Sequence, residues 1–326
     1  MKKILILLFV SVLLNACYDD YVKDYEYDGV YFPYQLDVRT LVVGEGMKIQ
    51  FGVALGGVSD NVRDRVVNYQ IDNSLINAQT LASMKGAATY IKNAVNPVTE
   101  LKLMPANYYQ LSDASKFLIK AGQHSASVTL KADSAKFLAD LSTLVATYAL
   151  PLRITSADAD SVLKAKSYAV IGLKYENMLF GNYWHGGITY VKDASGANID
   201  SLTLKYYTAI NAPTSKAWVL TTVEPMALTS NGYADVTNPT KQEMKLTLSG
   251  GKITVSSLPG ASVQILPDGD CTFNQAKLLQ NRKIYLKYKY VNSAGNTCYA
   301  QDTLTFRNRV RDGINEWQDE NPNNYK

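Results

Sequence analysis

The chain has 326 residues, 47% of them hydrophobic, with 33 basic and 29 acidic side chains. This composition is that of a globular protein, and the length suits about two domains. The slight excess of positive charge is dispersed without a basic patch, which excludes the electrostatic footprint of a nucleic-acid-binding protein.

The first 16 residues have the pattern of a secretory signal that ends at a cysteine. Two lysines form a positive n-region, and the apolar run Ile4–Leu14 is too short to span a bilayer. Leu14–Cys17 is similar to the processing site of bacterial lipoproteins, where the cysteine is acylated and becomes the N-terminus. We expect residues 1–16 to be a lipoprotein signal peptide and Cys17 to anchor the protein to a membrane. The alternative is an ordinary secretory signal beside a cysteine.

Residues 17–27 form an acidic tether behind this cysteine. Acidic residues at this place resemble the export signal that carries Bacteroidetes lipoproteins to the outer face of the outer membrane. A solvated linker on a periplasmic protein is the alternative. We expect a lipid-anchored outer-membrane protein that faces the cell exterior.

The remaining sequence is typical of β-structure. The 23 tyrosines of the whole chain and its many Thr and Val residues suit pleated surfaces. Alternating apolar and polar residues predict strands at 48–53, 125–130 and 245–248. Residues 284–291 and 300–306 flank a turn rich in Asn and Gly and predict a hairpin. Strands in series with short turns indicate antiparallel sheets.

Helices are expected to be few and short. Residues 73–84 can form one, with Asn73 or Ser74 as the N-cap, and residues 133–141 can form another. Neither is long enough to define an all-α domain. The predicted fold class is all-β with short helices.

A domain boundary is predicted near residue 175. Residues 168–175 have the pattern of a closing strand, and a new strand begins within Leu179–Gly187. The first domain would cover residues 28–175 and the second residues 176–326, both of ordinary size. No Pro/Ser-rich linker separates them, so we expect the domains to touch.

Several segments of the first domain resemble a known family. Asp28–Gln35, Val38–Leu41, Leu103–Tyr109 and Tyr148–Thr155 are similar to the N-terminal domain of many Bacteroidetes surface lipoproteins. In that family the domain also precedes glycoside-hydrolase-18-like modules. The resemblance implies an immunoglobulin-like β-sandwich, although no hydrolase module follows it in this chain.

The second domain resembles a different module. Gly181–Trp184 and Phe306–Trp317 are similar to an uncharacterised β-rich C-terminal lipoprotein domain that is often paired with the first. The Gly-x-Tyr-Trp opening is also similar to the start of lipocalin-like barrels, and roughly eight strand segments follow it. An antiparallel lipocalin- or calycin-like barrel would bury Trp184 as a plug, with Arg307 or Arg309 stacked on it. A sandwich is the alternative architecture.

Together, these resemblances imply a cell-surface lipoprotein of a polysaccharide-utilisation system. The expected function is non-catalytic binding of a polysaccharide or oligosaccharide, as an accessory of outer-membrane transporter components. One alternative is a structural or adhesion protein that contacts an outer-membrane partner protein. Another is a lipocalin-like carrier of a small ligand.

Few residues could support catalysis. His124 and His185 are the only histidines, which leaves little material for triads or metal sites. Nucleophile elbows, zinc-protease motifs and phosphate-binding loops do not occur in the sequence. A glycosidase needs only two carboxylates across a cleft, but no pair stands out. We expect no enzyme activity, no cofactor and no metal site.

Sugar binding requires aromatic rings beside planar polar groups, because sugar C–H faces stack on rings while hydroxyls need hydrogen-bond partners. The candidate ligand-binding residues are Tyr183, Trp184, His185, Tyr233 and Trp317. Tyr233 lies in a long polar loop and is the aromatic residue most expected at the surface. Trp218 alternates with its neighbours along a predicted strand and is expected in the core.

Cys271 and Cys298 each lie near a predicted turn. In an oxidising compartment they could form a disulfide, which would stabilise the fold by about 2–4 kcal/mol. Two buried free thiols are the other possibility, and the sequence leaves both open.

Overall fold

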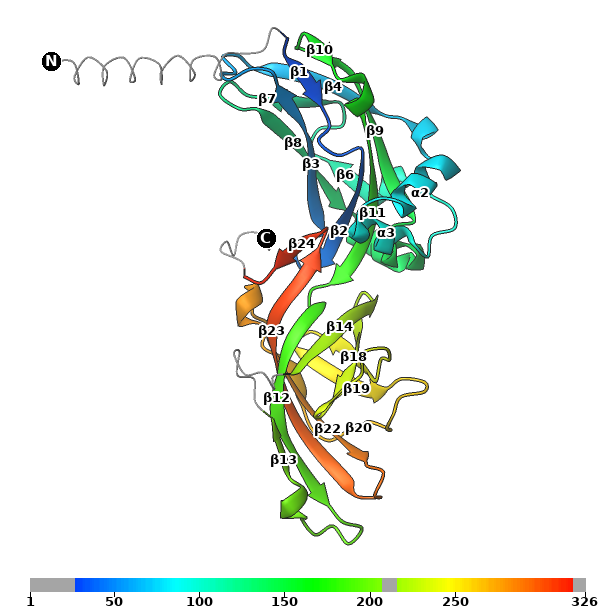
Figure 1. Cartoon of the computed structure of the whole chain (residues 1–326), viewed down its shortest axis with the longest axis vertical. Helices are drawn as coiled ribbons and strands as arrows, with labels where there is room; N and C mark the ends of the chain where they lie inside the picture. Colours follow the sequence, from blue (N-terminus) through cyan, green and yellow to red (C-terminus); the bar gives the residue numbers. More distant parts are fainter. Residues whose placement is uncertain (1–26, 207–215, 319–326) are drawn as a thin grey trace, which may run out of the picture.

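The computed structural model describes residues 27–206 and 216–318, which form an elongated molecule with two β-rich parts (Figure 1). The first part is a two-sheet sandwich, and the second is a closed antiparallel barrel. The predicted all-β fold class is therefore confirmed. No helix among the described residues is long and apolar enough to cross a membrane. Cys17 and the signal segment lie outside the described residues.

The sandwich is built from two curved sheets. One has the strand order β10-β1-β3-β8-β6, and the other has β2-β11-β9-β4-β7 with β5 beside β9. Phe117 packs against Phe32, Phe51 and Tyr69 between the sheets, with ring centroids 4.6–6.1 Å apart. The strands are β1 Gly29–Tyr31, β2 Leu36–Val43, β3 Lys48–Gly56, β4 Arg65–Ile71, β5 Lys102–Leu103, β6 Tyr109–Leu111, β7 Lys116–Ile119, β8 Ser125–Ala132, β9 Tyr148–Ala157, β10 Ser161–Val162 and β11 Tyr168–Asn177.

The short helices α2 and α3 cover one face of the six-stranded sheet (Figure 1), while α4 packs Phe137 into the core between the sheets. Met84 of α2 and Ile91 of α3 pack on Val38 and Val170 of the sheet. The helix predicted over 73–84 begins later, because Asn77 rather than Asn73 or Ser74 accepts the capping hydrogen bond. Residues 133–141 contain the second predicted helix. The helices are α2 Ala78–Lys85, α3 Thr89–Val95 and α4 Ser134–Ala139.

Eight strands of the second part close into a barrel. Their order is β12-β14-β15-β18-β19-β21-β22-β23, and β23 returns to pair with β12 from Tyr183↔Phe306 to Lys192↔Thr297. This closure decides between the two predicted architectures in favour of the barrel. The strands are β12 Gly181–Lys192, β14 Lys216–Glu224, β15 Ala227–Ser230, β18 Met244–Ser249, β19 Lys252–Ser257, β21 Cys271–Phe273, β22 Lys283–Val291 and β23 Thr297–Arg311.

Short additional strands decorate the barrel. One of them, β24, forms a hairpin with the end of β23 at the junction with the sandwich (Figure 1). The predicted hairpin of β22 and β23 is confirmed, with Val291 opposite Thr297 beside the turn. The additional strands are β13 Leu204–Tyr206, β16 Gly232–Tyr233, β17 Val236–Thr237, β20 Leu266–Pro267 and β24 Ile314–Glu316.

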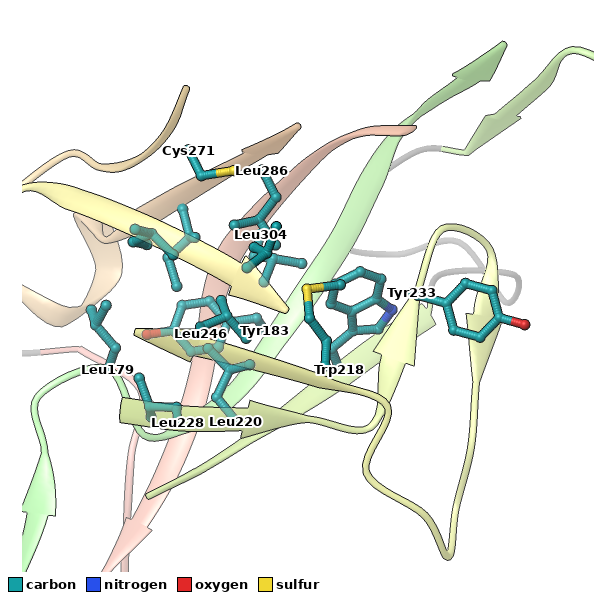
Figure 2. Close-up of a cluster of buried hydrophobic side chains, with 14 of the residues drawn as sticks. Leu179, Tyr183, Trp218, Leu220, Leu228, Tyr233, Leu246, Cys271, Leu286 and Leu304 are labelled. Atoms are coloured by element: carbon teal, nitrogen blue, oxygen red, sulfur yellow. The ribbon is translucent and has the colours of Figure 1, made fainter. Parts of the chain in front are cut away.

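Large side chains fill the barrel interior (Figure 2). Trp218 is fully buried there, which confirms its predicted core position. The predicted burial of Trp184 as a plug is wrong, because strand alternation turns Tyr183 and His185 inward and leaves Trp184 half-buried on the outer face. Arg307 does stack on Trp184, with the guanidinium carbon 4.4 Å from the ring centroid.

Cys271 and Cys298 are both buried and free, so the disulfide considered from the sequence is not present. The Cys271 thiol instead lies 3.3 Å from the Lys287 carbonyl oxygen, with which it hydrogen bonds. Burial raises the pKa of both thiols, which makes the reactive thiolate scarcer.

We expect both thiols to react only after unfolding. In a chain that begins at Tyr18, and so lacks Cys17, an alkylating reagent should label two cysteines in denaturant without reductant. Labelling of the native protein should be much slower, because both side chains are buried. Intact mass spectrometry measures both results. A denatured chain that takes up no label would show that a bridge forms.

Candidate functional site

A groove lies along the open edge of the sandwich. The strand β1 pairs with β3 only from Ala54 to Gly56, and β2 crosses to the other sheet, where it is the outermost strand. The two sheets therefore part beside the first half of β3. The resulting hollow, called here the sandwich groove, has a volume of about 380 Å³.

The sandwich groove has an apolar floor and a polar rim. Its floor includes the core side chains Phe32, Phe51 and Ile171, while Asp37 and Arg39 of β2 lie at its rim. Gln50, Ser125 and Ser127 of the opposite sheet also line it. A concave apolar surface with a few convergent polar groups is the usual form of a ligand site.

Tyr34 is the exposed aromatic residue of this groove. It follows Phe32, which anchors the chain in the core, and Pro33, which has no N–H to pair with a strand. Phe32 also accepts a hydrogen bond from the Gln35 side chain, which closes the turn between β1 and β2. The phenol of Tyr34 is 66% exposed and is available to stack on a ligand.

Asp37 and Arg39 are held in place by neighbouring groups. Asp37 accepts hydrogen bonds from its neighbour's backbone N–H at 2.8 Å and from the Tyr90 hydroxyl at 2.8 Å. The Arg39 guanidinium lies 3.3 Å from the Asp37 carboxylate and donates to the Gln50 carbonyl oxygen across the groove at 3.4 Å. Asp37 is itself buried, so the Arg39 guanidinium, whose position these contacts hold, is the group of the pair that the rim presents to solvent.

A second hollow of about 480 Å³ adjoins the first between the sandwich and the end of β23. We call it the interdomain cleft. Arg39 and Gln50 line both hollows, so groove and cleft adjoin at these two residues. A ligand long enough to pass Arg39 would reach both hollows.

The interdomain cleft is bordered by a buried ion-pair network. Glu45, in the turn between β2 and β3, accepts hydrogen bonds from Arg309 at 2.8 and 2.9 Å and from Arg282 at 2.7 Å. Burial raises the pKa of the Glu45 carboxyl, but the two guanidinium groups outweigh this effect and lower it below its ordinary value. Thr40 adds a hydrogen bond to Asp312 at 2.7 Å. These contacts hold the sandwich against the barrel.

The aromatic residues predicted from the sequence do not come together. Tyr183 and His185 point into the barrel, where the His185 ring stacks on Trp218 with centroids 4.2 Å apart. Nε2 of His185 is 3.0 Å from a carboxylate oxygen of Asp302, and the Tyr288 hydroxyl donates to the other oxygen at 2.5 Å. The His185 and Asp302 side chains are fully buried, so neither is exposed to a ligand in solvent.

Tyr233 is buried, contrary to the prediction that it is exposed. Its loop folds back over the barrel, since the Ala234 N–H donates to the Tyr288 hydroxyl at 2.6 Å. The Tyr233 ring then packs edge-on against Tyr290. Trp317 is 59% exposed beside β24, and Trp184 lies on the outer barrel face, so neither joins the sandwich groove.

Tyr34, Asp37, Arg39 and Gln50 were not predicted as site residues. The sequence does hold one signal, because Asp37 and Arg39 occupy alternate positions of a strand whose other residues, apart from Thr40, are apolar. Nothing in the sequence indicates that Gln50 lies across from them. Within the described ranges, no group of three or more His, Cys, Asp or Glu side chains could hold a metal ion.

Comparison with known proteins supports the fold and does not identify an activity. Residues 23–161 match the model of a family that is described as an N-terminal domain. No curated protein matches the chain. A crystal structure of a Bacteroides ovatus protein of unknown function is similar, with 20% identity and a TM-score of 0.61, over 91% of this chain and 99% of its own. A multidomain B. ovatus protein including DUF1735 has 12% identity and a TM-score of 0.41, over 90% of this chain and 100% of its own.

Proposed function

We propose that this chain is a non-catalytic, lipid-anchored surface protein that binds glycans in the sandwich groove, as an accessory of a polysaccharide uptake system. The observation that carries the proposal is the exposed Tyr34 ring beside Asp37, Arg39 and Gln50 over an apolar floor. Sugar rings stack their C–H faces on aromatic rings, and their hydroxyls pair with planar carboxylate, guanidinium and amide groups.

The adjacency of groove and cleft supports a polymeric ligand. A chain of sugars that stacks on Tyr34 and passes Arg39 would reach the sandwich–barrel junction, because Arg39 lines both hollows. The lipoprotein signal ending at Cys17 supports display at a membrane, where such a protein would hold polysaccharide near a transporter. The proposed anchor, outward display and transporter partner rest on the sequence.

We expect Tyr34→Ala to weaken glycan binding by about tenfold or more, because aromatic anchors dominate the binding energy of a site. Affinity electrophoresis against a panel of plant and host polysaccharides identifies a ligand for the natural chain. Isothermal titration with a fragment of that ligand then compares the variants.

Tyr27→Ala is the matched control, since Tyr27 is 68% exposed and does not line the groove. This variant should bind like the natural chain. Equal losses in the two variants would refute the assignment of the groove. Absence of binding to every polysaccharide would refute glycan binding altogether.

A second candidate function is adhesion to a partner protein. The observation in its favour is the uncovered strand edge beside the groove. There β2 is the outermost strand of its sheet, and β1 pairs only with Ala54–Gly56 of β3. An extended segment of a partner could add there as a further strand. This function would be favoured if the protein binds no polysaccharide and co-purifies with an outer-membrane protein.

A further inference from the structure

Positive charge is concentrated on the exposed side of the interdomain cleft. Arg39, Lys48, Arg309 and Arg311 line it, against the two carboxylates Glu45 and Asp312. Arg39 and Arg311 are about one-third exposed, at 33% and 34%. Lys48 is also exposed. The part of the cleft that a ligand would touch is therefore cationic.

The carboxylates of the cleft are turned toward the protein. Glu45 is only 5% exposed and accepts hydrogen bonds from both Arg282 and Arg309. Asp312 is 9% exposed and accepts from the Thr40 hydroxyl. Asp312 also lies 3.9 Å from the Arg39 guanidinium and Glu45 3.7 Å from that of Arg311, which pairs with Glu316 at 2.5 Å as well. The cationic side chains still dominate the solvent-facing side of the cleft, because both of its carboxylates are almost fully buried.

A like-charge pair extends this cationic surface onto the sandwich. Lys48 of β3 stands directly opposite Lys131 of β8, and both are exposed. Directly opposed residues of antiparallel strands project from the same face with Cβ atoms about 5 Å apart, where like charges are destabilising. The next pair along this face, Gln50 and Thr129, lines the cleft. An anion bound beside Lys48 and Lys131 would relieve the repulsion between their ammonium groups, so this pair is suited to binding an anion.

We infer that the interdomain cleft binds the oxyanion substituents, carboxylate or sulfate, of an acidic glycan, with Lys48, Lys131, Arg39 and Arg311 as the cationic contacts. This inference rests on the proposed glycan binding and specifies its ligand class. In such a complex Tyr34 stacks on one sugar, while the cleft pairs with the charged groups of sugars farther along the chain. Guanidinium groups suit this task, because their fork of donors matches a carboxylate or sulfate.

The test compares charged polymers with their neutral counterparts on the full protein. Polygalacturonate and its methyl ester form the carboxylate pair, and dextran sulfate and dextran form the sulfate pair. The variant is Lys48→Gln/Lys131→Gln, which relieves the like-charge contact and should fold at least as stably as the natural chain. The control is Lys283→Gln/Lys287→Gln, which removes the same charge from exposed positions on the barrel strand β22.

We expect the natural chain to prefer at least one charged polymer over its neutral counterpart. The Lys48/Lys131 variant should lose about tenfold in affinity for it, and added salt should weaken binding. The control variant should lose little. The polymer pair that shows the preference identifies the oxyanion.

Three results would overturn the inference. Equal binding of charged and neutral polymers would exclude a role of charge in recognition. The proposed function would stand in that case, provided that Tyr34→Ala still weakens binding. Equal losses in the two lysine variants would show nonspecific attraction. Absence of binding to any polymer, in this test and across the wider polysaccharide panel, would overturn both this inference and the proposed function.

Discussion

Replacing Glu45 by alanine is expected to lower the free energy of unfolding by about 3–5 kcal/mol, because loss of one partner leaves buried charges uncompensated. Glu45 pairs with Arg309 and Arg282 at the sandwich–barrel junction, and all three side chains are buried. Denaturation in urea, followed by tryptophan fluorescence and circular dichroism, measures the change.

The matched control for this prediction is Glu224→Ala. Glu224 forms an ion pair with Lys245 at 2.6 Å, but its side chain is 53% exposed. Exposed pairs contribute at most about 1 kcal/mol, so this variant should stay close to the natural chain. Similar losses in the two variants would contradict the structural role assigned to Glu45.

The effect of Glu45 should also depend on pH. Its pKa in the folded protein is lowered below the ordinary value of 4.5. The stability that it contributes is therefore fully present above that value and is lost as the pH falls through the lower, folded pKa. The pKa of Asp312 is raised, so this residue gives stability a pH dependence of the opposite sign, but it is present in both the natural chain and the Glu45→Gln variant. The stability difference between the natural chain and Glu45→Gln should consequently narrow in acid.

Trp218→Ala is expected to cost about 3–5 kcal/mol of stability, the usual loss for a large aromatic residue in a core. Trp218 is fully buried, stacks on His185 and lies between the apolar side chains of the barrel interior and Tyr233 (Figure 2). A Cβ atom on Gly232 would come within 2.3 Å of its indole nitrogen, which shows how closely the loop after β15 covers this ring. Urea denaturation measures the loss.

Trp184→Ala supplies the control from the neighbouring strand. Trp184 of β12 lies opposite Ala217 of β14, which is the residue before Trp218. The Trp184 side chain faces the outside of the barrel. Its main contact is the Arg307 guanidinium, and such a cation–π contact contributes about 0.5–1 kcal/mol at an exposed site. A loss as large as that of Trp218→Ala would mean that the assignment of inner and outer faces is wrong.

Local sequence patterns predicted the secondary structure well. Alternation identified β3, β8, β18, β22 and β23, because each strand has one face in a core and one in solvent. Asn and Gly residues at the β22–β23 turn marked the hairpin. The helix α3 was missed, since its seven residues lack a side-chain cap.

The inner and outer faces of the barrel were harder to predict. Tyr183, Trp184 and His185 are consecutive, and a shift of one residue exchanges the buried and exposed faces of a strand. Only the pairing of β12 with both β14 and β23 settles that Tyr183 and His185 point inward. The loop around Tyr233 has the composition of an exposed turn, but hydrogen bonds to the barrel bury it.

The all-β class and the positions of several long strands follow from the sequence, because they depend on residues close together in the chain. The lipoprotein-like address at Cys17 stays a prediction from the sequence. That the second part is a barrel follows from tertiary structure, since closure joins β12 to a strand more than a hundred residues later. The same holds for the candidate site. Tyr34 comes from the turn before β2, Arg39 and Gln50 come from two different sheets, and Arg311 comes from the far end of the chain. Such a surface exists only after long-range packing has brought these elements together.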